Sequence, residues 1–219
     1  MVKVGLTGGI ASGKSTVCAM FSGLGAKVLE TDVLAREAVQ PGRPAWVRLR
    51  RAFGTDFFHP DGSLDRRLLR SLVFRHPERR RQLNEIVHPE VMHAVKAWLE
   101  DMGSREPDSV LLVDVPLLVE VGAVKGFDRV VVVFIREAIQ LARLMERDGL
   151  SLEEASQALE AQMPLREKLA FGDYVIDNSG RLEETRAQVE AVWRELLDLA
   201  HAVRPGDVTT RGGGDPETG

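Results

Sequence analysis

Gly8, Gly13, Lys14 and Ser15 have the spacing of the phosphate-binding pattern G-x-x-x-x-G-K-S. Glycines let the backbone curl so that successive N–H groups point inward toward an anion. In this pattern the lysine contacts the β- and γ-phosphates of a nucleoside triphosphate, and the hydroxyl holds Mg²⁺. We therefore predict a nucleotide site with Lys14 as a catalytic residue and Ser15 as a metal ligand. The residues predicted to form the site are Gly8, Gly9, Ala11, Ser12, Gly13, Lys14, Ser15 and Thr16.

The chain on both sides of this loop has the pattern that the site requires. Val2, Val4 and Leu6 alternate as in a short buried strand, and residues 16–21 are typical of a buried helix. A helix N-terminus adds free N–H groups and a partial positive charge beside the phosphates. Because strand, loop and helix follow in this order, a chance Gly-rich turn is the weaker interpretation.

Two carboxylates, Glu30 and Asp32, lie at the end of the next apolar segment. In an open α/β sheet, ligands bind beyond the carboxyl ends of the strands, where the phosphate loop also lies. Side chains alternate along a strand, so we expect both carboxylates on the same side. A carboxylate facing a γ-phosphate can accept the proton of an attacking hydroxyl or help to hold Mg²⁺. Asp32 is equally well placed to cap the helix that follows, and the pattern leaves both roles open.

Short segments rich in β-branched residues alternate with helical patterns, which predicts an α/β fold with a doubly wound, five-stranded parallel sheet and helices on both faces. The predicted strands are residues 3–6, 27–30, 110–113, 129–134 and 174–176. The predicted helices are residues 14–23, 64–74, 89–101, 137–147, 151–161 and 181–200. Ser151 and Glu154 have the spacing of a capping box at the start of one of them.

The gap between residues 33 and 109 is too long for a single crossover, so it must contain an inserted helical subdomain. We place this insertion at about residues 40–104, within a single domain of residues 1–204. The tail, residues 205–219, is rich in Gly, Pro and Thr and is predicted to be disordered.

The net charge of −4 conceals a basic region, because residues 43–81 contain eleven arginines against four acidic residues. Such a region can bind nucleic acid, a membrane surface or a small polyanion, or it can simply be solvated. Its aromatic residues are spaced like core residues and do not indicate a stacking platform. We therefore expect an anionic small-molecule substrate and no nucleic acid.

The sequence contains no run of about twenty apolar residues, so we expect no membrane association. Cys18 is the only cysteine, which excludes an intramolecular disulfide, and we interpret it as a small buried side chain. These observations favour a cytoplasmic protein. They do not indicate its oligomeric state.

Seven segments resemble the dephospho-CoA kinase family and follow its order between residue 3 and about residue 200. They are residues 6–16, 32–36 (Asp-Val-Leu-Ala-Arg), 62–67 (Gly-Ser-Leu-Asp-Arg-Arg), 87–89 (Val-His-Pro), 115–120 (Val-Pro-Leu-Leu-Val-Glu), 162–166 (Gln-Met-Pro-Leu-Arg) and 175–178 (Val-Ile-Asp-Asn). The resemblance implies ATP- and Mg²⁺-dependent phosphorylation of the ribose 3′-hydroxyl of dephospho-CoA, the last step of coenzyme A synthesis. ATP and dephospho-CoA are the partners that it implies.

The resemblance also implies roles for single residues. Asp32 matches the base that orients or deprotonates the acceptor hydroxyl. Arg143 and Arg147 lie at i and i+4, as a lid helix closing on ATP requires, within a lid region at about residues 137–168, and a solvated helix face is the alternative for this pair. The other implied nucleotide contacts are Arg166 and Asn178, and Asn178 is also a turn signal. The implied acceptor contacts are Arg66, His88, Leu117, Leu118 and Glu120, and His88 equally suits a cap for a helix that starts at Pro89.

Three positions depart from the family pattern or match it weakly. Glu30 stands where the family usually has Asp. Ala11 replaces a common Gly, and we expect this to need only a negative φ there. Asp114 ends an apolar strand as a metal-binding acid does, and is a weak candidate for a metal ligand.

The alternatives to a dephospho-CoA kinase are a P-loop kinase for nucleosides, nucleotides or shikimate, and a nucleic-acid-associated ATPase. The acceptor-side segments argue against the first, and the lack of a stacking platform argues against the second.

Overall fold

Five short apolar segments form one parallel sheet in the computed structural model, which describes residues 1–202. The strands are β1 (Val2–Gly8), β2 (Lys27–Glu30), β3 (Val110–Asp114), β4 (Arg129–Phe134) and β5 (Tyr174–Asp177). Their order is β2-β3-β1-β4-β5, and every neighbouring pair is parallel. The predicted five-stranded α/β fold is confirmed, and each predicted strand lies within two residues of its observed ends.

Helices separate the strands and form the arm that extends from the sheet. They are α1 (Lys14–Leu24), α2 (Thr31–Ala38), α3 (Pro44–Phe53), α4 (Arg66–Arg75), α5 (Pro77–Arg105), α6 (Glu137–Asp148), α7 (Leu152–Glu160), α8 (Leu165–Lys168) and α9 (Leu182–Ala202). Short 3₁₀ turns lie at Thr55–Phe57, Ala123–Gly126 and Leu169–Phe171. The predicted capping box at the start of α7 is present, with Ser151 and Glu154 bonding reciprocally.

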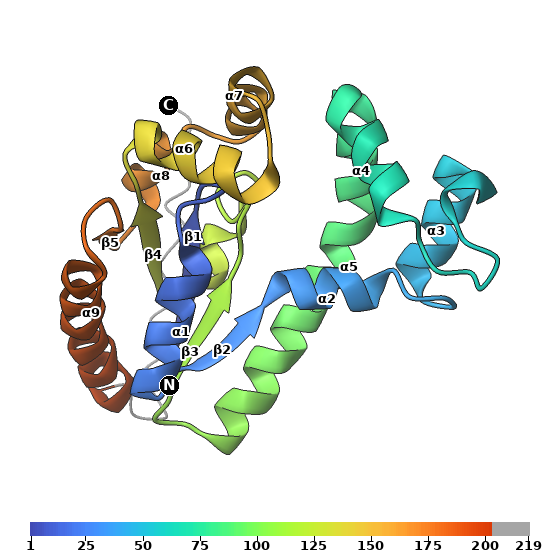
Figure 1. Cartoon of the computed structure of the whole chain (residues 1–219). Helices are drawn as coiled ribbons and strands as arrows, with labels where there is room; N and C mark the ends of the chain where they lie inside the picture. Colours follow the sequence, from blue (N-terminus) through green and yellow to red (C-terminus); the bar gives the residue numbers. More distant parts are fainter. Residues whose placement is uncertain (203–219) are drawn as a thin grey trace, which may run out of the picture.

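Helices pack on both faces of the sheet through apolar side chains, which form one buried layer on each face. On one face, α1 and α9 pack on the strands through fully buried residues such as Phe21 and Leu196. On the other face, the C-terminal half of α5 packs through Val95 and Leu99, together with residues of α8 and the turn after it. Figure 1 shows α9 and α5 on opposite sides of the strands. Cys18 is buried in the first layer, as expected, and burial raises the pKa of its thiol to about 12.

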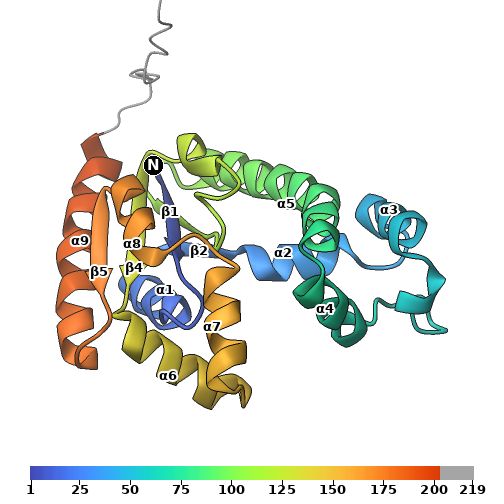
Figure 2. The same ribbon diagram turned by 90° about the horizontal axis from the view of Figure 1, so that it is seen from above.

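The arm consists of α2, α3, α4 and the N-terminal half of α5, and it extends away from the sheet (Figure 2). Its own core is small: Val39, Ala45 and Leu49 are buried, and partly buried neighbours pack around them. The helix expected to start at Pro89 begins instead at Pro77, and Pro89 lies inside α5. An interior proline removes one backbone hydrogen bond, which a helix packed at both ends tolerates.

No helix among residues 1–202 is long and apolar enough to cross a membrane. The predicted disordered tail, residues 205–219, lies outside the described residues.

Candidate active site

The phosphate loop connects the end of β1 to the start of α1, as the motif requires. Gly13 caps α1 with φ +88°, a left-handed conformation that glycine adopts without steric cost. Ala11 has φ +56° and is the only non-glycine residue with positive φ among residues 1–202. The expectation of a negative φ at Ala11 is therefore wrong. The loop needs a left-handed residue there, and a Cβ in that region costs roughly 1 kcal/mol.

A cleft of about 1110 Å³ runs from this loop to the arm. Lys14, Ser15 and Asp32 line it at the sheet, and Asp114 lies at the carboxyl end of β3 beside them. At the far end, side chains from α2, α4 and α5 close the cleft. The residues predicted to act on the phosphates and on the acceptor hydroxyl therefore share one cavity.

Asp32 is not a helix cap. The N-cap of α2 is Glu30, which makes no side-chain capping bond, and Asp32 lies in the first turn. The argument from strand alternation also fails, because β2 ends at Glu30. Thr31 Oγ1 donates to the backbone oxygen of Asp114 (2.8 Å), which ties the start of α2 to the end of β3. Asp32 and Asp114 are thereby held near one another in the cleft.

Asp114 is the most perturbed acid of the cleft. Its Oδ1 is buried and has no hydrogen-bond partner. The pKa of Asp114 is raised to about 6, mainly by burial; Lys14 opposes the shift, and the charges of Asp32 and Glu30 add to it. No cluster of three or more His, Cys, Asp or Glu that could hold a metal by itself occurs among residues 1–202. Mg²⁺ commonly binds through one or two carboxylates together with substrate phosphates, and an unpartnered carboxylate oxygen fits such an ion.

Comparison with known proteins places these residues in a family. A protein-family model described as dephospho-CoA kinase matches residues 2–184. The chain belongs to the dephospho-CoA kinase family. A dephospho-CoA kinase from Geobacter metallireducens is 46% identical over 198 residues, covering 90% of this chain and 98% of that protein.

Two solved structures are also similar to this kinase. One, from Thermus thermophilus, has 36% sequence identity and a TM-score of 0.73, and the match covers 89% of this chain and 97% of that one. The other is a dephospho-CoA kinase from Campylobacter jejuni, with 26% identity, a TM-score of 0.67 and coverage of 90% and 97%. The sheet and its helices are accordingly those of a P-loop kinase.

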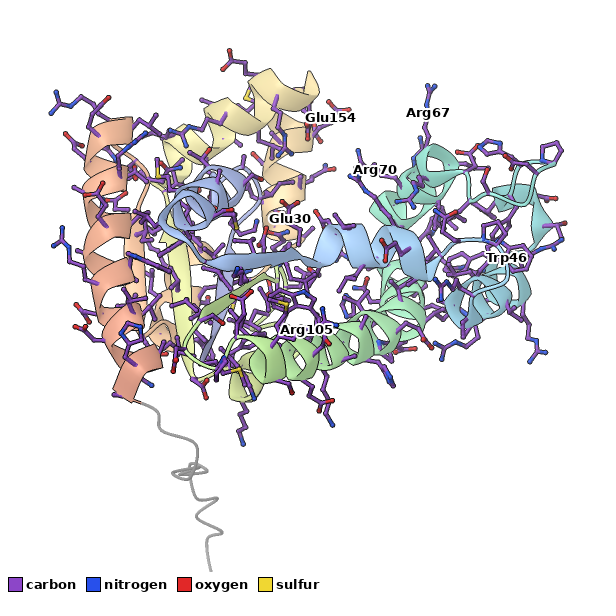
Figure 3. All side chains as sticks on the ribbon, turned by 90° about the horizontal axis from the view of Figure 1, so that it is seen from below. Glu30, Trp46, Arg67, Arg70, Arg105 and Glu154 are labelled. Carbon is purple, nitrogen blue, oxygen red and sulfur yellow. The ribbon has the colours of Figure 1, made fainter. Side chains whose placement is uncertain are left out.

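Three arginines form the arm's side of the cleft in this kinase: Arg36 on α2, and Arg66 and Arg70 on α4. Arg66 donates to the backbone oxygen of Arg36 (3.3 Å). Burial lowers the pKa of Arg66, and the charge of Arg36 lowers it further. Within residues 1–202 none of the three forms an ion pair with a carboxylate. In Figure 3, Arg70 projects toward the gap between the arm and the sheet, whereas Arg67 points away from the body.

The other predicted acceptor residues divide into two groups. His88 and Leu117 line the cleft, and burial lowers the pKa of His88, so this imidazole is neutral near pH 7. His88 lies in the middle of α5 and caps no helix. Leu118 is fully buried and packs beside Gly5 in the core. Because the chain turns after β3, neighbouring residues point in different directions, and Leu118 does not line the cleft.

Glu120 also lies outside the cleft, where it pairs with a lysine that the sequence did not single out. Lys168 is fully buried, and its Nζ lies 2.8 Å from Glu120 Oε1 and donates to the backbone oxygen of Pro116 (3.1 Å). Glu120 Oε1 also accepts from the backbone N–H of Met163 (3.2 Å). The pair joins α8 to the segment after β3 and so supports the cleft from behind.

The predicted nucleotide-side residues are also placed differently from one another. Arg147 lines the cleft and makes two hydrogen bonds to Asp148, both of 2.8 Å. Arg143, one turn earlier on α6, donates to the backbone oxygen of Asn178 (3.4 Å) beside the loop. Arg166 lines a second cavity, of about 580 Å³, that adjoins Gly9 on another side of the phosphate loop.

Asn178 is buried, and both ends of its amide bond within the protein. Its Nδ2 donates to the backbone oxygen of Ser12 (2.8 Å), and its Oδ1 accepts from Thr185 Oγ1 (3.0 Å). Sequence reasoning also missed two glutamines, Gln140 and Gln162, that contact the loop in a similar way. A polar residue on an apolar helix face is the only signal that marked Gln140.

Proposed function

We propose that this chain transfers the γ-phosphoryl group of ATP to the ribose 3′-hydroxyl of dephospho-CoA, with Mg²⁺ bound at the phosphates, in the cytoplasm. The observation that carries the proposal is the continuity of the cleft. It places Lys14 and Ser15 at one end, three unpaired arginines at the other, and Asp32 between them. A kinase needs this order of donor site, reacting hydroxyl and acceptor anchor.

On the donor side, the phosphates of ATP lie against the loop and the N-terminus of α1, whose N–H groups face an anion. The Lys14 ammonium neutralises charge on the transferred group. Ser15 and Asp114 are the residues that would hold Mg²⁺, which neutralises charge on the β- and γ-phosphate oxygens when bound. The unpartnered Oδ1 of Asp114 supports its assignment as the carboxylate of this site.

On the acceptor side, dephospho-CoA carries a diphosphate, and guanidinium groups bind such oxygens by paired hydrogen bonds. Arg36, Arg66 and Arg70 supply unpaired guanidiniums at that end of the cleft. This anchor presents the ribose toward the sheet, where Asp32 lies. His88 and Leu117 provide an uncharged surface along the way.

The transfer itself is one displacement. The 3′-oxygen forms a bond to the γ-phosphorus, the bond from that phosphorus to the β–γ bridging oxygen breaks, and the hydroxyl proton passes to the Asp32 carboxylate. ADP leaves with the bridging oxygen. Arg143 and Arg147 on α6 cover the nucleotide side and exclude water, which would otherwise accept the phosphoryl group.

Replacement of Asp32 by Asn tests this assignment. Asn has nearly the same shape and cannot accept the hydroxyl proton, so we expect kcat to fall by about a hundredfold or more while ATP binding persists. Coenzyme A formation from Mg-ATP and dephospho-CoA is followed directly, and ATP affinity is measured by titration. Glu30→Gln is the matched control, since Glu30 lies two residues away and outside the cleft lining, and it should change kcat much less.

Normal turnover by Asp32→Asn would remove Asp32 as the base. The acceptor assignment is tested separately on the wild-type protein. Nucleosides, nucleotides and shikimate are offered in place of dephospho-CoA, and faster turnover of any of them would overturn the substrate assignment.

A further inference from the structure

Side-chain amides from three separate elements bond to the backbone of the phosphate loop. Gln140 on α6 donates from Nε2 to the backbone oxygen of Ile10 (2.7 Å), and Gln162, between α7 and α8, accepts at Oε1 from the backbone N–H of Ile10 (3.0 Å). Asn178, after β5, donates to the backbone oxygen of Ser12 (2.8 Å). These three amides therefore hold the loop from outside.

The loop needs such partners for a simple reason. A backbone that turns its N–H groups toward an anion turns its carbonyl oxygens away from it, and a buried carbonyl without a partner costs about 1–3 kcal/mol. Gln140 and Asn178 are each only 5% exposed, so water does not replace them readily. An amide can satisfy a carbonyl, as Gln140 and Asn178 do, or an N–H, as Gln162 does, without adding charge beside the phosphates, whereas a lysine would compete for them and a carboxylate would repel them.

Two glycines of the phosphate loop make room for these amides. Gly9 does not have a positive φ, so its backbone conformation does not require glycine. A Cβ on Gly9 would overlap Nε2 of Gln140, and a Cβ on Gly13 would overlap Nδ2 of Asn178. Gly9 and Gln140 therefore form a matched pair, in which the missing side chain of one admits the amide of the other.

We propose that Gln140, Gln162 and Asn178 are positioning residues that fix the phosphate loop in its nucleotide-binding shape before ATP arrives and set the lid against it. Gln140 shares α6 with Arg143 and Arg147, so its bond to Ile10 also sets where these arginines lie. Gln162 precedes Met163, whose N–H bonds to Glu120 of the buried ion pair. The inference rests on the proposed nucleotide site and does not depend on which acceptor is used.

Substitution of each glutamine by Met tests the proposal, because Met is similar in size and has no amide. Hydrogen exchange of the amides of residues 9–16 is measured without nucleotide, together with the KM values for ATP and dephospho-CoA. For Gln140→Met and Gln162→Met we expect exchange in the loop to rise by about tenfold, as the loss of one net hydrogen bond of about 1.4 kcal/mol implies. The KM for ATP should rise by a similar factor while the KM for dephospho-CoA stays the same.

Replacement by Glu separates hydrogen bonding from charge. Gln162 acts as an acceptor, so Gln162→Glu keeps its bond to Ile10, whereas Gln140 acts as a donor, so Gln140→Glu loses it. Both variants add one negative charge near the loop. We expect loop exchange to stay near the wild-type rate in Gln162→Glu and to rise in Gln140→Glu. Equal rates in the two variants would overturn the proposal.

The glycine pairing gives a further test by a double-mutant cycle. Gly9→Ala should raise the KM for ATP strongly in the wild-type background and much less in a Gln140→Ala background, where the overlap is removed. An equal effect in both backgrounds would overturn the pairing. Faster exchange spread evenly over the whole chain would show a general structural role instead of positioning. If wild-type turnover of dephospho-CoA were absent, the exchange results would still decide this inference.

Discussion

Different kinds of chemical group line the cleft on the side of the sheet and on the side of the arm. The sheet lies between two apolar layers, and its proposed donor site is built around the backbone of the phosphate loop, which neutral amides hold in place. The arm has a small apolar core around Val39, Ala45 and Leu49, and its proposed acceptor site consists of arginine side chains that form no ion pair among residues 1–202. We therefore infer that the nucleotide side is shaped in advance, whereas the guanidinium groups of the proposed acceptor side form close ion pairs only when an anion binds.

The largest effect is expected from breaking the donor side at Lys14. Lys14→Ala removes one charge contact to the transferred phosphate, which costs about 3–4 kcal/mol at the transition state, or roughly a hundred- to a thousandfold in kcat. Coenzyme A formation measures the loss. Lys96→Ala, on the exposed face of α5, is the control and should leave kcat unchanged. Near-normal turnover in a folded Lys14→Ala protein would exclude the phosphate loop from the mechanism.

The second largest effect is expected at the buried ion pair between Lys168 and Glu120. Lys168→Met leaves the Glu120 carboxylate without its partner, and we expect the free energy of unfolding to fall by about 3 kcal/mol. Urea denaturation measures this value. The double variant Lys168→Met/Glu120→Gln removes both charges and should recover most of the loss. Lys96→Met in the exposed pair Lys96–Glu100 should change stability by less than about 1 kcal/mol. Equal losses at the two sites would contradict the structural role of the buried pair.

Asp114 tests whether a buried charge on the nucleotide side of the cleft lowers the stability of the folded protein. Its pKa is raised from 3.8 to about 6, so the folded protein binds this proton more tightly than the unfolded chain does. The charged carboxylate therefore lowers stability above pH 6, and this cost disappears as the pH falls toward 4. Without Mg²⁺ and nucleotide, Asp114→Asn should raise the free energy of unfolding by about 2 kcal/mol at pH 8 and not at pH 4.

Asp56→Asn on the exposed surface of the arm provides the control for Asp114, with less than about 0.5 kcal/mol expected at either pH. A stability gain for Asp114→Asn that is the same at both pH values would contradict the ionisation argument.

The smallest effect is expected on the acceptor side, where several arginines share the ligand. Arg66→Gln should raise the KM for dephospho-CoA by about tenfold, equivalent to about 1.4 kcal/mol, and leave the KM for ATP unchanged. Arg67→Gln on the same helix points away from the body and should change neither KM (Figure 3). Similar effects of both substitutions, or equal effects on both substrates, would show that binding depends on the net positive charge of the arm and not on individual arginines.

Local patterns predicted the sheet and the nucleotide loop well. Runs such as Arg129–Phe134 are short and rich in valine, and the glycine spacing from Gly8 to Gly13 defines the loop by itself. Both features depend on residues adjacent in the chain. The arm was predicted less well: α2 and α3 were not among the predicted helices, and α5 begins at Pro77 and continues through Pro89, where a helix start had been expected.

The residue types of the site were easier to predict than the directions in which their side chains point. Lys14, Ser15, Asp32, Arg66, His88 and Leu117 do line the cleft. Leu118 and Glu120 do not, because the turn after β3 directs them into the core and toward Lys168. Partners such as Gln140 and Gln162 act from more than 100 residues away along the chain, and the only local signal is the polar side chain of Gln140 on an apolar helix face.

Pro89 divides the 29-residue helix α5 into a half that packs on the sheet and a half that carries the arm. Sharp bends in helices concentrate at proline, so we expect any bending of α5 to occur at this residue. The lever beyond it, from Pro89 back to Pro77, is about 18 Å long at 1.5 Å per residue. A bend of about 10° at Pro89 would carry the far end of the arm by about 3 Å. Bending at this one position would therefore be enough to widen or narrow the cleft between the arm and the sheet.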